Sequence, residues 1–354
     1  MATAPALPID LPLERNGLHY PFADAPQPGA LIEVAAGLHW WRLPMAGPLK
    51  HVNGFVLEGA EGLTLIDTGF NSDEALAHWR ALLAGPLAQS QVAQVLCTHF
   101  HPDHVGLAGW LCRKFDAPLA MTRTEWLQLR LLTADARDDV PDEMVAFWRA
   151  AGWTDEQVAH ASQRGWGNFR RMVARLPLGF RRLVEGDMLD LGGAAWEVVI
   201  GSGHSPEHAC LLDAKRGILI AGDQVLPRIS SNVSLTVSEP EGDPLGDWLA
   251  SIAKLKRLPA DLLVLPGHGD PFTGLHVRLD QLAAEHAERL DKLAAHLAEP
   301  QRAVDCFAQL FRRPIGAEVI GMATGEALAH LRHLEVIGRA RREVRDGVWW
   351  FSAT

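Results

Sequence analysis

Residues 92–104 read Val-Ala-Gln-Val-Leu-Cys-Thr-His-Phe-His-Pro-Asp-His, an apolar run followed by three histidines and an aspartate within six residues. The run predicts a strand over Val92–Thr98. His99 and His101 alternate by two, so an extended backbone directs both imidazoles to one side. Asp103 and His104 open a segment whose pattern predicts a helix over Asp103–Phe115. Imidazole and carboxylate are zinc ligands, so this segment predicts a metal site.

Three other segments share the same design, an apolar strand that ends in His or Asp beside glycine. They are Trp196–His204, Gly217–Asp223 and Asp261–His268. Functional sites form where loops at strand ends converge, so we expect all four ends to meet at one edge of the fold. The predicted donors are His99, His101, Asp103, His104, His204, Asp223 and His268.

Seven donors are too many for one tetrahedral ion. They suit two divalent metals about 3.5–4 Å apart, with an aspartate and a hydroxide bridging them. Zinc is the metal we expect, although iron and manganese accept the same ligands. Isolated histidines, such as His286 and His330, are interpreted as core or surface residues.

The bulk composition narrows the class of protein. The chain has 354 residues, 48% of them apolar, and a formal net charge of −10, which does not favour nucleic acid as a partner. The four cysteines, Cys97, Cys112, Cys210 and Cys306, form no CxxC pair and are interpreted as buried thiols. We find neither a signal peptide nor a membrane span, and we expect a cytoplasmic protein that does not bind membranes.

The chain divides into three expected parts. Residues 1–30 form an N-terminal extension, 31–275 a catalytic domain, and 276–354 a C-terminal helical domain. Within the catalytic domain, a helical insertion is expected at about 121–185, and it is rich in tryptophan. The tail closes with a predicted β-hairpin over Arg341–Ser352, which favours a small winged-helix-like unit.

Several motifs together resemble the metallo-β-lactamase-fold hydrolase superfamily. They are His99-Phe100-His101-Pro102-Asp103-His104, Gly203-His204-Ser205-Pro206-Glu207-His208, Gly222-Asp223 and Pro266-Gly267-His268-Gly269, with Asp67-Thr68-Gly69 similar to the family's early Asp-x-Gly turn. The resemblance implies an α/β fold of four layers, the αβ/βα sandwich, with the metals at one edge.

The resemblance also assigns roles to the site residues. It implies that His99, His101 and His204 bind the first metal, that Asp103, His104 and His268 bind the second, and that Asp223 bridges them. Asp103 and Asp223 are the carboxylates assigned to catalysis. Asp67 would orient a ligand histidine, and His208 would lie beside the metals without binding them.

The tail adds a finer resemblance. Glu285–Leu290, Gly325–Leu331, Gly338 and the closing hairpin are similar to the branch that contains β-lactamase-like protein 2 and hydroxyacylglutathione hydrolases. Members of that branch carry a C-terminal winged-helix unit, and some act on RNA. The insertion is longer than that branch implies.

The sequence is compatible with several classes of substrate. Our first hypothesis is that a hydroxide attacks the carbonyl of a small thioester or related ester. The alternatives are a ribonuclease or phosphodiesterase, a lactonase, and a non-catalytic sensor. Asp223 argues against a true β-lactamase. The chain's one tyrosine, Tyr20, lies far from the motifs, which argues against a lactonase. The insertion's tryptophans are interpreted either as a lid over the metals or as its own core, and a homodimer is left open.

Overall fold

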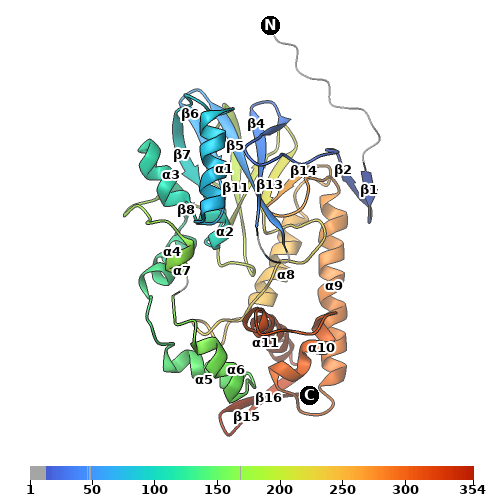
Figure 1. Ribbon diagram of the computed structural model, residues 1–354. Helices are drawn as coiled ribbons and strands as arrows, with labels where there is room; N and C mark the ends of the chain where they lie inside the picture. Colours follow the sequence, from blue (N-terminus) through green and yellow to red (C-terminus); the bar gives the residue numbers. More distant parts are fainter. Residues whose placement is uncertain (1–12, 46, 48, 168) are drawn as a thin grey trace.

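The computed structural model describes residues 13–45, 47, 49–167 and 169–354 (Figure 1). Residues 1–12 of the expected N-terminal extension lie outside the described residues. The described part of that extension begins with a short hairpin of β1, Leu13–Arg15, and β2, Leu18–Tyr20. The side chain of Tyr20 is buried and packs near Phe272, with ring centroids 6.4 Å apart.

The first large sheet has seven strands in sequence order, β3 to β9. Its first four strands pair antiparallel, and the pairs from β6 to β9 are parallel. The bounds are β3 Ile32–Ala35, β4 Leu38–Pro44, β5 His51–Gly59, β6 Gly62–Ile66, β7 Val92–Leu96, β8 Leu119–Thr122 and β9 Arg181–Leu183.

The second sheet has five strands, β10 to β14, of which only the last pair is parallel. The bounds are β10 Met188–Leu191, β11 Ala194–Gly201, β12 His208–Asp213, β13 Ile218–Gly222 and β14 Leu263–Pro266. Side chains from both sheets, including Trp40, Phe55 and Trp196, form one shared core between them.

Helices cover the outer face of each sheet. The seven-stranded sheet packs against α1, Asp73–Ala84, and α3, Ala108–Phe115, through a second core. The five-stranded sheet packs against α8, Pro244–Leu255, and α9, Leu275–His296, through a third. This order of helix, sheet, sheet and helix confirms the predicted αβ/βα sandwich.

Two expected helical segments differ in detail. The helix expected over Asp103–Phe115 is broken into α2, Pro102–Val105, and α3. The break lies at Leu107, whose main-chain N–H donates to the carbonyl of Gly69 at 3.1 Å instead of continuing the helix. The region 121–185, expected to be helical, includes the end of β8 and the whole of β9. Its helices are α4 Arg123–Ala134, α5 Asp142–Ala150, α6 Asp155–Ser162 and α7 Phe169–Met172.

The tail continues from α9 through η1, Ala303–Cys306, and α10, Phe307–Leu310, to α11, Ile320–Val336. The predicted hairpin follows as β15, Ala340–Arg345, and β16, Val348–Ala353. In Figure 1 this tail lies beside α5 and α6. Among the helices of the described residues, none combines the length and hydropathy needed to span a bilayer.

The insertion is joined to the tail by aromatic side chains. Nε1 of Trp153 donates a buried hydrogen bond of 2.8 Å to Oγ1 of Thr324 in α11. Phe147 meets Trp349 of β16 edge to face, with ring centroids 5.6 Å apart. Phe147 and Trp153 of the insertion therefore pack against the tail, whereas Trp126 belongs to the core beneath the seven-stranded sheet and stacks on Phe180.

Candidate metal centre

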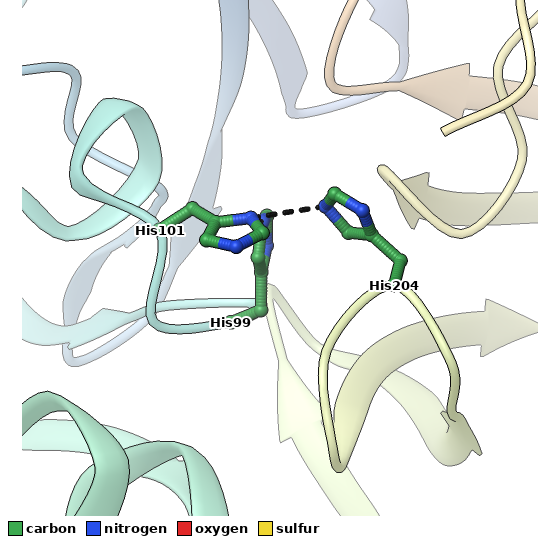
Figure 2. Close-up of side chains that lie close together, drawn as sticks. All are labelled: His99, His101 and His204. Carbon is green, nitrogen blue, oxygen red and sulfur yellow. Dashed lines mark hydrogen bonds between the residues drawn. The ribbon is translucent and has the colours of Figure 1, made fainter. Parts of the chain in front are cut away.

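Four strand ends meet at one edge of the sandwich, as expected from the sequence. The segment after β7 carries His99 and His101, and the loop after β11 carries His204. Figure 2 shows their imidazoles turned toward one another. Nδ1 of His101 lies 2.9 Å from Nε2 of His99 and 3.0 Å from Nε2 of His204. Three ring nitrogens thus converge on one small volume.

A second group of donors lies next to the first. Nε2 of His268 is 3.3 Å from Oδ2 of Asp103, and Nε2 of His104 is 3.7 Å from the same oxygen. Asp103 and His104 come from α2, and His268 follows β14. The structure therefore gathers Asp103, His104 and His268, the group that the family resemblance implies for the second metal.

Asp223 lies between the two groups. Its Oδ1 is 3.4 Å from Nε2 of His104, and its Oδ2 is 3.5 Å from Nε2 of His204 and 3.3 Å from Nε2 of His268. Oδ1 thus faces the second group of donors, and Oδ2 faces both groups. This is the arrangement that a carboxylate shared by two cations requires.

The polar atoms at the centre of the cluster fit metal ions. Nε2 of His104, Nε2 of His268 and Oδ1 of Asp223 are buried and have no hydrogen-bond partner among the described residues. An unpaired buried polar atom is costly, so such atoms are expected to have a ligand. A divalent cation would satisfy all three, and nitrogen and carboxylate donors suit zinc, iron or manganese.

Hydrogen bonds on the far side of each ring fix which nitrogen faces the cluster. Nδ1–H of His104 donates to Asp67, and Nδ1–H of His204 donates to the carbonyl of Asn232, both at 2.8 Å. Nδ1–H of His268 donates to the carbonyl of His51 at 2.5 Å. In each case Nε2 keeps its lone pair for the cluster. His101 is the exception, since it turns Nδ1 inward.

Asp67 orients two of the histidines at once. Besides His104, its carboxylate accepts hydrogen bonds from the hydroxyl and the main-chain N–H of Thr98. The Thr98 hydroxyl in turn lies 3.0 Å from Nδ1 of His99, which can donate to it. Asp67 thereby supports a histidine of each group, a wider role than the single contact predicted.

The electrostatics of the cluster favour positive charge at its centre. Burial opposes protonation of His104 and His268, but the carboxylates around them outweigh it. The pKa of His104 is raised well above its usual value by Asp223 and Asp103, and that of His268 is raised to about 10. Despite its burial, Asp103 has a pKa lowered to about 2 by His104 and His268. The carboxylates are anionic at neutral pH.

His208 lies beside the cluster with its nitrogens engaged elsewhere. Its Nε2 accepts the main-chain N–H of Asp223 at 3.1 Å, and its ring stacks on His99 with centroids 4.8 Å apart. A nitrogen that accepts a hydrogen bond has no free lone pair for a metal. The geometry agrees with the supporting role that the resemblance implied.

Sequence reasoning missed Glu125 in the first turn of α4. This carboxylate is fully buried and accepts the main-chain N–H groups of Phe100 and Glu207, both at 2.8 Å. It thus ties the loop of His99 and His101 to the loop of His204. Burial raises the pKa of Glu125 to about 7, although the two backbone donors favour the ionised form. An acidic residue in a helix's first turn is common, so no sequence signal marks this role.

Gly267 is required by close packing. A Cβ at this position would overlap Oδ1 of Asp223 and lie 2.7 Å from Cε1 of His104. The main chain before His268 therefore approaches the shared carboxylate closely, and only glycine permits that approach.

Comparison with known proteins agrees with this geometry. Residues 47–268 match the metallo-beta-lactamase superfamily. The chain belongs to the metallo-beta-lactamase superfamily. Residues 290–354 match a second family, the metallo-beta-lactamase-like C-terminal domain, which accounts for the helices and hairpin of the tail. Both the recognition of the family and that of a companion C-terminal domain are confirmed.

Individual members of the superfamily resemble most of the chain. A beta-lactamase domain protein from Burkholderia ambifaria has a crystal structure that superposes with a TM-score of 0.88 at 38% identity, covering 95% of this chain and 98% of that one. The probable metallo-hydrolase YqjP of Bacillus subtilis is 26% identical over 83% of this chain and 91% of its own.

A more distant relative carries a named activity. The atrochrysone carboxyl ACP thioesterase of Aspergillus fumigatus is 23% identical over 71% of this chain and 45% of that protein. The chain is thus a metallo-hydrolase of this superfamily.

Proposed function

We propose that this protein is a binuclear metal-dependent hydrolase that cleaves thioesters or related esters of small molecules. The observation that carries the proposal is the position of Asp223, whose two oxygens face the two donor groups while Oδ1 has no hydrogen-bond partner among the described residues. The expected ligands are His99, His101 and His204 for one metal and Asp103, His104 and His268 for the other. Zinc is the metal proposed.

The residues around the cations would each have a defined task. When bound, the metals would supply Lewis acidity, which polarises a carbonyl and lowers the pKa of water toward about 7. Asp103 and Asp223 supply the negative charge that retains the cations. Asp67 and Thr98 hold the rings of His104 and His99 in place, so that little reorganisation is needed during the reaction.

Two observations favour an acyl substrate over a nucleic acid. The distant Aspergillus relative is named as a thioesterase. The space in front of His101 is bordered by Phe100 and Phe169, whose rings stack with centroids 5.8 Å apart. An apolar border suits an acyl chain better than a phosphodiester backbone, which needs cations along its path.

The test combines metal analysis with a substrate panel. The purified protein is dialysed against zinc, its metal content is measured by mass spectrometry, and its activity is measured on acyl-coenzyme A thioesters, p-nitrophenyl esters, lactones, bis-p-nitrophenyl phosphate and single-stranded RNA. We expect two metals per chain and cleavage of thioesters. Asp223→Asn should retain the fold, bind less metal and lose most activity.

Two results would contradict the proposal. Cleavage of RNA or the phosphodiester by a zinc-loaded protein that leaves every thioester and ester intact would assign the alternative function. A stoichiometry of one metal per chain that Asp223→Asn does not change would exclude a shared carboxylate.

A further inference from the structure

A large cavity extends from the candidate metal centre to the C-terminal domain. Its volume is about 1430 Å³, and it lies between the helical insertion and the start of α11. His101 and Phe100 are among its lining residues, so the cavity adjoins the histidine cluster at His101. Small-molecule sites usually measure about 300–1,000 Å³, so this one has room for a large ligand.

The walls of the cavity are largely apolar. Trp148 and Trp153 stack with ring centroids 4.9 Å apart and an interplanar angle of 1°, and both are more than nine-tenths buried. Ile320 of α11 and Leu235 of the loop before α8 are buried residues on the same wall. Apolar walls with a few polar groups are typical of sites for apolar ligands.

Charge at the cavity does not favour an anionic ligand. Arg164, which borders it, pairs with Glu318 at 2.9 Å, so this guanidinium is already neutralised. The pairing of Arg164 favours an uncharged group in this cavity.

We propose that the cavity binds the acyl part of the substrate, and that this part is a large apolar group, either a fused aromatic system or a long aliphatic chain. The proposal rests on the proposed function, because it places the scissile carbonyl at the His101 end and the acyl group against the stacked tryptophans. Substrate selection is then performed by the insertion and the C-terminal domain together, at a distance from the metal ligands.

Gly321 offers a direct way to test the site. It borders the cavity in the first turn of α11, and a Cβ built there meets no atom within 4 Å among the described residues. Replacing glycine inside a helix with another residue removes a cost of up to about 1 kcal/mol, so the fold should tolerate the change. Gly321→Phe adds a ring at the border of the cavity, and Gly321→Ala adds only a methyl group.

The first experiment measures binding without turnover. Calorimetry follows the binding of two product-like acids, 1-naphthoate and dodecanoate, to the zinc-loaded protein and its variants. We expect one or both acids to bind, Gly321→Phe to weaken that binding by roughly tenfold or more, and Gly321→Ala to have a smaller effect. The acid that binds more tightly identifies a flat or a flexible acyl group.

A matched control adds the same bulk elsewhere. Gly179 is exposed, does not border the cavity, and likewise has no atom within 4 Å of a Cβ among the described residues. Gly179→Phe should bind both acids as the native protein does. Failure of both acids to bind the native protein, or equal binding by Gly321→Phe and the native protein, would overturn the proposal.

The second experiment measures selectivity and separates the two proposals. The native protein should have a higher kcat/KM for decanoyl or naphthoyl thioesters than for acetyl thioester, and Gly321→Phe should reduce that ratio by about tenfold. Binding of the acids that depends on Gly321, without cleavage of any thioester, would support the cavity and contradict the proposed reaction. Cleavage of thioesters with no acyl preference would support the proposed reaction and contradict the role of the cavity.

Discussion

The side-chain amide of Asn232 donates a hydrogen bond of 3.1 Å to Oε2 of Glu326 in α11. The carbonyl of the same Asn232 accepts Nδ1–H of His204. Glu326 also accepts from Arg289 of α9 at 3.3 Å. The C-terminal helices are therefore connected to a candidate metal ligand through one loop residue, and the C-terminal domain is a structural part of the metal centre.

This connection predicts an effect of Glu326→Ala on the first donor group. Removal of the carboxylate leaves the Asn232 amide without its acceptor, so the loop that orients His204 should loosen. Loss of such supporting contacts typically costs 10–100-fold in metal affinity, and we expect about tenfold here. Retained zinc after dialysis against a chelator measures the effect.

Glu335→Ala on the same helix is the matched control. Glu335 pairs with Arg332 at 2.7 Å, and among the described residues it makes no hydrogen bond to Asn232 or His204, so its loss should leave metal content unchanged. Equal metal retention by both variants would show that the connection through Asn232 does not support the site.

Asp67→Asn should separate the effect of the negative charge of Asp67 from the effect of its left-handed backbone conformation. Asp67 has a φ of 59°, a left-handed conformation that asparagine adopts readily. The variant should fold normally but lose the negative charge that supports His104 and, through Thr98, His99. We expect metal affinity to fall roughly 10–100-fold, with kcat falling as well. Asp116→Asn is the control, because Asp116 is exposed, has a similar φ of 53° and lies at the end of α3.

Glu125→Gln should destabilise the protein although it changes few atoms. Glutamine has one acceptor oxygen, so either the Phe100 or the Glu207 N–H would face an NH₂ group in a buried position. An unsatisfied buried donor costs about 1–3 kcal/mol, which urea unfolding would detect. Glu74→Gln, at an exposed position in the first turn of α1, should change the free energy of unfolding by only a few tenths of a kcal/mol. Similar effects of the two changes would contradict the role of Glu125.

Gly267→Ala should disrupt the shared carboxylate. The added methyl group would displace Asp223 from its position between the donor groups, or move the main chain of His268. We expect the variant to lose at least one of its two metals and nearly all hydrolytic activity, as measured by mass spectrometry and a thioester assay. Gly316→Ala provides the control, since a Cβ there meets no described atom within 4 Å. Full metal occupancy in Gly267→Ala would refute the packing argument.

Two buried histidines of the C-terminal helices should make stability depend on pH. Burial lowers the pKa of His286 to about 3 and that of His330 to about 4, from an ordinary value of 6.5. The unfolded chain therefore binds more protons between pH 6.5 and pH 4, and the free energy of unfolding falls as the pH falls through this range. For His330 alone, the loss is on the order of 3 kcal/mol by pH 4.

The measurement is urea unfolding of metal-free protein at several pH values in this range, which removes the contribution of metal release. His330→Gln should unfold more easily at pH 7, because the hydrogen bond of His330 to the Glu326 carbonyl is lost, but its stability should depend less on pH. An unchanged pH dependence in the variant would exclude His330 as a source of the effect.

Strand-end motifs made most of the site predictable. His99, His101, Asp103 and His104 occur within six residues, and His204, Asp223 and His268 each follow an apolar strand, so their convergence followed from the fold. The start of helix α1 is also encoded locally, because Ser72 is an N-cap whose hydroxyl accepts from the N–H of Ala75.

The supporting contacts were not predictable, for a physical reason. Glu125, Asn232 and Glu326 act through long-range hydrogen bonds whose partners are main-chain groups or residues far away in the chain. No local periodicity or spacing encodes such a contact. The strands β8 and β9 were obscured in the same way, because short parallel strands depend on their neighbours more than on their own sequence.

The hydrogen bond between Trp153 and Thr324 joins segments 171 residues apart on one wall of the acyl cavity. Neither segment makes that wall alone. In a chimera that carries the insertion of a relative but keeps its own α11, the two segments would therefore not pack against each other as they do here. Exchange of specificity between members of the superfamily should therefore require both segments to be inherited together, while the seven metal-facing residues can stay as they are.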